Sequence, residues 1–160
     1  MREKKSKLGT TIVPNTESRT HLGRDSATVA STESQNAAFA AANAAEEKKA
    51  KSTVVLDVRG VTLLADFFVF TGGDSKTQVK AIAQAVQDKL AKQGRKARSV
   101  EGLTEARWVL LDFGDLIVHV LHEQERDYYK LEQFWNHALI VNPDEWRDSG
   151  NLESKESAES

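Results

Sequence analysis

Two histidines and a neighbouring carboxylate are the residues whose types could hold a metal ion: His119, His122 and Glu123. Imidazole nitrogens and carboxylate oxygens are common ligands of zinc. The two histidines stand three residues apart on an expected strand, so their side chains point to opposite faces of the sheet. No third ligand is evident, and the chain contains no cysteine. A structural or interface role is therefore favoured for both histidines, and no metal or other cofactor is predicted.

A glycine-rich turn, Gly72-Gly73-Asp74-Ser75, lies between an expected strand and an expected helix, where backbone amides often bind phosphate. Its spacing matches neither the Walker loop nor the GxGxxG pattern. A Gly-Ser turn in this place is typical of nucleotidyltransferases, but those enzymes also hold Mg²⁺ with two or three carboxylates on a neighbouring strand. The next expected strand, 96–100, contains no carboxylate. A helix cap is favoured, and a nucleotidyltransferase-like enzyme stays open as the less favoured alternative.

The second half of the sequence combines aromatic rings with negative charge. Residues 99–135 hold three Lys or Arg against eight Asp or Glu. Alternation on the expected strand 107–112 places Trp108, Leu110 and Asp112 on one face of the sheet. A tryptophan bordered by Asp112 and Asp115 has the composition of a protein-binding anchor, and acidic surroundings disfavour phosphate backbones. The segment 107–135 is therefore predicted to bind a protein, although core packing explains most of its six aromatic residues: Trp108, Phe113, Tyr128, Tyr129, Phe134 and Trp135.

Hydrophobic periodicity predicts the elements that position these residues. Runs of β-branched and aromatic residues predict strands at 54–58, 67–71, 107–112 and 116–121, with a weaker strand at 96–100. Phe113-Gly114-Asp115 predicts a tight antiparallel hairpin between the last two strands. A short closing helix is expected over 123–135. A longer amphipathic helix, capped by Asp74 or Ser75 and ended by Gly94, is predicted from one apolar stripe: Val79, Ile82, Ala83, Val86 and Leu90.

This order of elements predicts an α/β fold, with a mixed β-sheet of about five strands flanked by helices. An alanine-rich helix is also expected over 32–51. Because Phe39 is its only large apolar residue, that helix is expected to pack weakly along one edge. No apolar run approaches the ~18 residues that a membrane span requires.

Composition divides the chain into three parts. Residues 1–31 are basic, rich in hydroxyl groups and poor in large apolar residues, which predicts a disordered N-terminal extension. Residues 32–142 form the expected folded domain. Residues 143–160 hold two Lys or Arg against six Asp or Glu, which predicts an acidic flexible tail. A cytoplasmic location is expected, or an organelle stroma or matrix if residues 1–31 are a transit peptide.

Three blocks of the sequence together resemble one known family. They are LDVRGVTLLADFFVFTGG (56–73), SKTQVKAIA (75–83) and VEGLTEARWVLLDFGDLIVHVLHEQERDYYKLEQFW (100–135). In this order they resemble the ribosomal silencing factors, the RsfS/Iojap family, and the match extends over about residues 36–141. The long N-terminal extension before it and the acidic segment after Pro143 depart from the family pattern.

The resemblance implies a fold distantly related to nucleotidyltransferases, without their catalytic carboxylates and without enzymatic activity. It implies binding to the large ribosomal subunit at its fourteenth protein, which sterically blocks association with the small subunit and represses translation when nutrients are short. In the family, the tryptophan of the RWVLLD strand faces that ribosomal protein. The resemblance therefore assigns partner-binding roles to one tryptophan and its expected neighbours: Trp108, Leu110, Asp112, Asp115, His119 and Tyr129.

Charge agrees with a ribosomal protein as the partner, because ribosomal proteins are basic and residues 99–135 are acidic. Neither direct sequence-specific nucleic-acid binding nor membrane binding is predicted. Some family members self-associate, so a homodimer stays open. An assembly factor of the large subunit could use the same surface, and this alternative also stays open.

Overall fold

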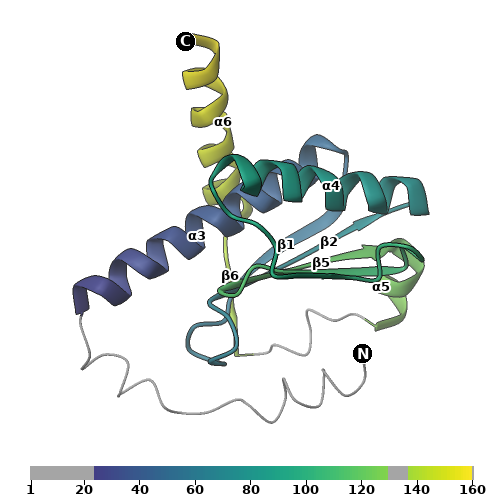
Figure 1. Cartoon of the computed structure of the whole chain (residues 1–160), viewed down its shortest axis with the longest axis horizontal. Coiled ribbons are helices and arrows are strands. Elements are labelled where there is room, and N and C mark those ends of the chain that lie inside the picture. Colours follow the sequence, from purple (N-terminus) through teal and green to yellow (C-terminus); the bar gives the residue numbers. More distant parts are fainter. Residues whose placement is uncertain (1–23, 130–136, 160) are drawn as a thin grey trace.

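The computed structural model describes residues 24–129 and 137–159, which form a mixed sheet flanked by helices (Figure 1). The described strands make one six-stranded sheet in the order β3-β4-β5-β2-β1-β6. Strands β2 and β5 pair in parallel, and the other neighbours are antiparallel. The predicted α/β class is confirmed, with one more strand than expected. The strands are β1 (Lys51–Asp57), β2 (Phe67–Gly73), β3 (Ser99–Glu101), β4 (Trp108–Asp112), β5 (Leu116–His122) and β6 (Leu139–Ile140).

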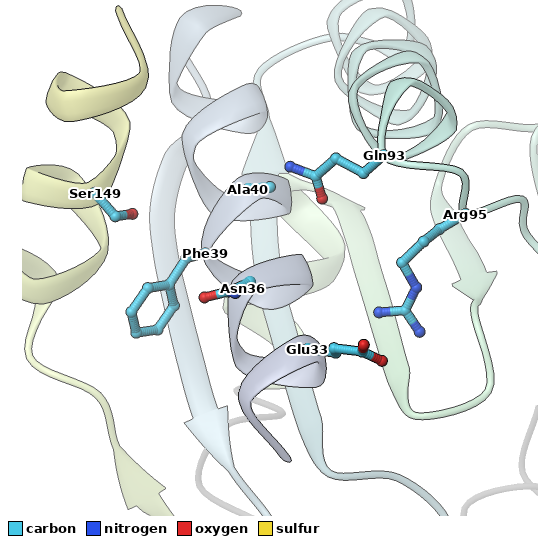
Figure 2. A pocket seen from close by; sticks show the side chains of 7 residues that line it. All are labelled: Glu33, Asn36, Phe39, Ala40, Gln93, Arg95 and Ser149. Atoms are coloured by element: carbon cyan, nitrogen blue, oxygen red, sulfur yellow. The ribbon is translucent and has the colours of Figure 1, made fainter. Parts of the chain in front are cut away.

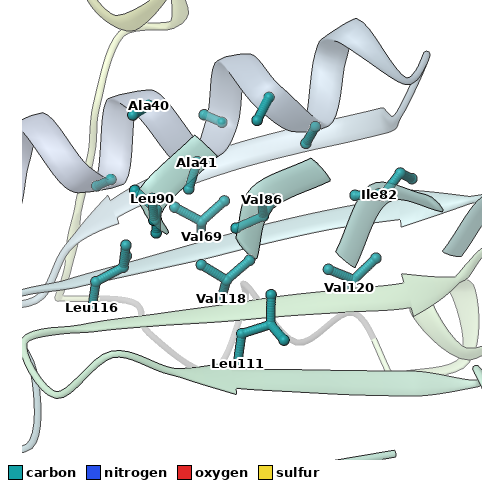
Figure 3. Packing of buried hydrophobic residues seen from close by; sticks show 14 of the residues in the cluster. Ala40, Ala41, Val69, Ile82, Val86, Leu90, Leu111, Leu116, Val118 and Val120 are labelled. Carbon is teal, nitrogen blue, oxygen red and sulfur yellow. The ribbon is translucent and has the colours of Figure 1, made fainter. Parts of the chain in front are cut away.

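The helix α4 (Lys76–Lys92) forms as its apolar stripe predicts. All five stripe residues are fully buried, and they pack against the inward side chains of β4, β5 and β2 (Figure 3). The hydroxyl of Ser75 caps the first turn by accepting a hydrogen bond from Gln78 N at 3.1 Å. Gly94, at φ +78°, ends the helix in the left-handed conformation that glycine adopts without strain.

The helix α3 (Arg24–Glu47) packs far more closely than its composition suggested. The alanines in its second half face both the sheet and α4, and they belong to the same core as the stripe of α4 (Figure 3). Methyl side chains let a helix backbone approach a neighbouring element closely, so the lack of large apolar residues does not weaken the contact. The expectation of weak packing along one edge was therefore wrong. The buried alanines are Ala37, Ala38, Ala40, Ala41, Ala42, Ala44 and Ala45.

The hairpin of β4 and β5 is confirmed, with Trp108 opposite Leu121 and Asp112 opposite Ile117. Its turn places Gly114 at φ +93°, and Gly114 N donates to Asp112 Oδ1 at 2.8 Å. The closing helix α5 (Glu123–Tyr129) begins where it was expected. The remainder of that prediction, residues 130–136, lies outside the described residues.

The two ends of the chain differ from the composition-based expectations. Residues 1–23 of the predicted extension lie outside the described residues, but 24–31 are helical and form the start of α3. The segment expected to be a flexible tail contains α6 (Pro143–Glu159). Trp146 in this helix is fully buried and belongs to the core, which overturns the expectation of a flexible start for this segment. A single tryptophan anchors a helix whose other residues are mostly polar.

Hydrogen bonds and close packing hold α6 against α3. Asn43 Nδ2 donates to Trp146 O at 2.7 Å, and Arg147 Nε donates to Glu46 Oε1 at 2.8 Å. A Cβ atom on Gly150 would lie only 2.6 Å from the side chain of Asn43, so glycine permits this approach.

Candidate partner-binding surface

The sheet has two faces of different character. Helices α3 and α4 cover one face, against which Val109, Leu111, Val118 and Val120 pack. The alternate residues of β2, β4 and β5 point to the opposite face, which we call the second face. Helix α5 contacts β5 and β2 and lies on the side of the sheet away from α4 (Figure 1). The second face carries Phe68, Phe70, Trp108, Leu110, Asp112, Ile117, His119 and Leu121.

An aromatic cluster forms the centre of the second face. The rings of Phe70 and His119 stack with their centroids 4.5 Å apart and an interplanar angle of 8°. Phe68 meets His119 edge-on at 5.7 Å and Phe70 edge-on at 6.2 Å. All three rings are buried. Such stacked and edge-on contacts hold the rings more firmly than burial alone would.

Trp108 is bound to this cluster and remains half-buried. Its indole Nε1 donates a hydrogen bond to His119 Nδ1 at 3.1 Å, and the two ring centroids lie 6.0 Å apart. Since Nδ1 accepts this bond, the contact fits a neutral imidazole whose hydrogen is on Nε2. The bond satisfies the polar atom of the indole and fixes the ring in one orientation.

Three other predicted contact residues can be placed relative to Trp108. Leu110 and His119 share the second face with it but are buried, so they support the surface from below. Asp112 also lies on this face and is half-buried. One of its oxygens accepts from Gly114 N, and the other lies 3.7 Å from Arg98 Nη2. Asp112 therefore stabilises the hairpin turn as well as contributing charge.

Asp115 lies apart from Trp108, contrary to the sequence-based expectation that it borders the indole. Trp108 begins β4, whose four residue steps span about 13 Å, and Asp115 lies in the turn beyond the other end of this strand. Asp115 forms an ion pair with Arg95, and its Oδ2 lies 2.5 Å from Ser34 Oγ. Its backbone oxygen accepts from Asp66 N at 2.7 Å. These contacts join α3 to the hairpin and to the start of β2.

Sequence reasoning missed Ile117 and could not resolve Tyr129. Ile117 is half-buried on the second face, directly opposite Asp112 on β4. Alternation along 116–121 carries this information, but every residue of the run except His119 is apolar, so the two faces look alike. The backbone of Tyr129 ends α5, while its side chain lies outside the described residues, so its role stays a prediction.

The glycine-rich turn is closed by internal hydrogen bonds. Asp74 N donates to Gln78 Oε1 at 2.7 Å, and Gln78 Nε2 donates to the backbone oxygens of Lys48 and Lys49 at 3.1 and 3.0 Å. The ion pair of Lys51 and Asp74, at 2.7 Å, raises the pKa of Lys51 and lowers that of Asp74. An amide already bonded and a carboxylate beside it both oppose phosphate binding. The helix-cap interpretation is confirmed by Ser75.

A polar groove of about 560 Å³ lies between α3, α6 and the end of α4 (Figure 2). Its walls include side chains of opposite charge, Glu33 and Arg95, together with Asn36, Gln93 and Ser149. Four of the predicted partner-binding residues lie elsewhere, on the second face, whereas Asp115 forms an ion pair with Arg95 of the groove wall: the four are Trp108, Leu110, Asp112 and His119. Within residues 24–129 and 137–159 no group of three potential metal ligands converges. In the same part of the chain, no helix is both long and apolar enough to cross a membrane.

Comparisons with known proteins agree on one family. A family model described as "Ribosomal silencing factor during starvation" matches residues 31–160. The ribosomal silencing factor RsfS of Bacillus subtilis is 43% identical over 104 residues, which cover 65% of this chain and 88% of that protein. The chloroplastic protein Iojap of Zea mays is 36% identical over 104 residues, which cover 65% of this chain and 45% of that protein.

Solved structures of similar proteins share the fold. A crystal structure from Bacillus halodurans is 43% identical with a TM-score of 0.57, and the match covers 64% of this chain and 92% of that one. One from Chromobacterium violaceum is 39% identical with a TM-score of 0.62, over 64% of this chain and 85% of that one. The family model spans most of the chain, including the core, the second face and α6, and the chain belongs to the ribosomal silencing factor (RsfS) family.

Proposed function

We propose that this chain represses translation under nutrient limitation by binding the large ribosomal subunit at its fourteenth protein through the second face. Trp108 is the central contact, and Asp112 and Ile117 lie on the same face at the other end of the hairpin strands. Leu110 and His119 hold these residues in place from below. Tyr129 and Asp115, which the family resemblance also suggests, are the less directly supported members of the surface.

The hydrogen-bonded, half-buried indole of Trp108 is the observation that supports this proposal most. A tryptophan held rigidly at a surface loses little conformational freedom on binding, and such residues often dominate the energy of protein interfaces. The surrounding segment 99–135 holds eight acidic against three basic residues, which complements a basic ribosomal protein. Binding there would block subunit association by steric exclusion.

The mechanism requires no chemical step, and we infer that the protein is a regulatory factor and not an enzyme. The closed glycine-rich turn supports this inference, because its amide and its carboxylate disfavour a nucleotide. The same proposal places the protein in the cytoplasm, or in the stroma or matrix of an organelle. It includes no membrane-bound partner and no sequence-specific nucleic-acid partner. A homodimer stays a prediction.

Co-sedimentation of the purified chain with large ribosomal subunits tests the contact. Trp108→Glu places a charge where the indole should pack and is expected to lower the bound fraction at least tenfold, since central interface residues typically contribute about 2 kcal/mol or more. Thr77→Glu is the matched control, because Thr77 is exposed on α4, away from the second face. Circular dichroism verifies that both variants fold. Undiminished sedimentation of folded Trp108→Glu would refute the proposed surface.

A further inference from the structure

The end of α4 and the link to β3 carry a concentration of positive charge. Residues 89–98, which we call the basic segment, hold five Lys or Arg and no Asp or Glu. This contrasts with the acidic segment 99–135 that follows it directly. The two segments lie next to each other in the fold as well, because the backbone amide of Arg98 donates a hydrogen bond to Asp112 O on β4.

Three cations of the basic segment extend into solvent. Lys92 and Lys96 are exposed, and the side chain of Arg98 is 71% exposed. Arg95 is half-buried and forms an ion pair with Asp115. Arg98 approaches a carboxylate only at 3.7 Å, from Asp112, which is a weak interaction at an exposed position.

Stabilisation of α4 does not account for all three charges. Lys89 and Lys92 stand in the last turn, where cations interact favourably with the negative end of the helix dipole. Lys96 and Arg98 lie beyond the last residue of the helix, and the dipole effect is confined to the final turn. Their exposure and position are therefore better explained by an external partner of negative charge.

The basic segment borders the proposed partner-binding surface. Arg98 N donates to Asp112 O at 2.6 Å, and the guanidinium of Arg98 lies next to Gly114 in the hairpin turn. Asp112 and Ile117 form the end of the second face closest to this turn. A large partner that covers the hairpin from Trp108 to Ile117 would thus also come close to Arg98 and Lys96.

We propose that Lys92, Lys96 and Arg98 contact the phosphate backbone of RNA in the large ribosomal subunit while the second face binds a protein of that subunit. This inference rests on the proposed function. Contacts from lysine and arginine to phosphate add affinity without reading sequence, and the planar guanidinium of Arg98 can bind two phosphate oxygens at once. The second face thus fixes the position, and the basic segment strengthens the complex in a salt-dependent manner.

The salt dependence of binding distinguishes this role from general charge attraction. Removal of one lysine–phosphate interaction should make the slope of log affinity against log salt concentration shallower by about 0.7 to 0.9. Lys92→Gln/Lys96→Gln is therefore expected to reduce the steepness of the slope by about 1.5. Lys76→Gln/Lys80→Gln, which removes the same charge from exposed positions on the first turns of α4, is expected to leave the slope unchanged. Equal slopes for wild type and Lys92→Gln/Lys96→Gln, or an equal change of slope in both variants, would overturn the proposal.

Cross-linking then identifies the partner of the basic segment. The chain has no cysteine, so Lys96→Cys provides a unique attachment point for a short photoreactive probe. In complexes of the labelled full chain with large subunits, adducts with ribosomal RNA are expected. Adducts with protein alone would mean that the basic segment contacts an acidic protein surface and not RNA, which would refute the proposal. Co-sedimentation of the wild-type chain with large subunits separates this outcome from failure of the proposed function. If the wild-type chain does not bind large subunits at all, the proposed function itself fails.

Discussion

The contact of Trp108 with His119 links the core of the second face to its surface. His119 is buried between the aromatic rings and the indole, so its contacts with both hold the half-buried side chain of Trp108 against the core. Alternation in the sequence was sufficient to place Trp108, Leu110 and Asp112 on one face. Proximity in the sequence was misleading for Asp115, because the length of β4 separates it from Trp108 and its partners come from α3 and from the segment after α4.

The pair of Lys51 and Asp74 allows a prediction of pH dependence. Asp74 has a pKa lowered from 3.8 chiefly by its hydrogen bond to Lys51, so its contribution to stability is present above 3.8 and is lost as the pH falls through the folded-state pKa. Lys51 has a pKa raised from 10.5 by the same bond, so its contribution is present below 10.5 and is lost as the pH rises through the folded-state pKa.

The variant Asp74→Asn is expected to remove both dependences. The difference in unfolding free energy between wild type and Asp74→Asn should be constant between these limits and should shrink at either extreme. Urea unfolding at a series of pH values measures it. A difference that does not change with pH would show that the ion pair contributes nothing measurable.

At the scale of elements, the sequence predicted best where periodicity and burial coincide. Five apolar positions were enough for α4, and the hairpin followed from a short turn between two apolar runs. Prediction failed for α3 and α6 because their packing depends on tertiary contacts that composition hides. In the sequence, a run of alanines indicates helix propensity but not burial. A single tryptophan in an acidic segment likewise does not indicate that it belongs to the core.

The anchoring of α6 by Trp146 predicts a large effect of a single substitution. Trp146→Ala is expected to lower the unfolding free energy by about 3–5 kcal/mol, since the ring is fully buried and leaves a cavity against α3. Arg147→Ala, which removes the neighbouring exposed ion pair with Glu46, is expected to have a much smaller effect, because exposed ion pairs are screened by solvent. Chemical denaturation compares the two. Similar small effects for both would mean that α6 contributes little to the fold.

At the scale of the whole molecule, the two faces of the sheet differ, and the proposed partner-binding surface lies on the face opposite α3 and α4. Helices α3 and α4 complete the core on one face (Figures 1 and 3). The second face presents Trp108 on a rigid aromatic base, next to an exposed basic segment. Under the proposed function, such a protein would act only by occupying the large subunit and sterically excluding the small subunit. Its effect on translation should therefore depend on occupancy of the large subunit and not on turnover of any substrate.

Subunit joining in an order-of-addition experiment tests the central claim most directly. Large subunits are incubated with a saturating amount of the full chain before small subunits are added, and the joined fraction is measured by light scattering. We predict that the wild-type chain strongly reduces joining, that Thr77→Glu does the same, and that folded Trp108→Glu leaves joining as it is without the protein. Normal joining in the presence of saturating wild-type protein, or inhibition by Trp108→Glu equal to that of wild type, would contradict the account.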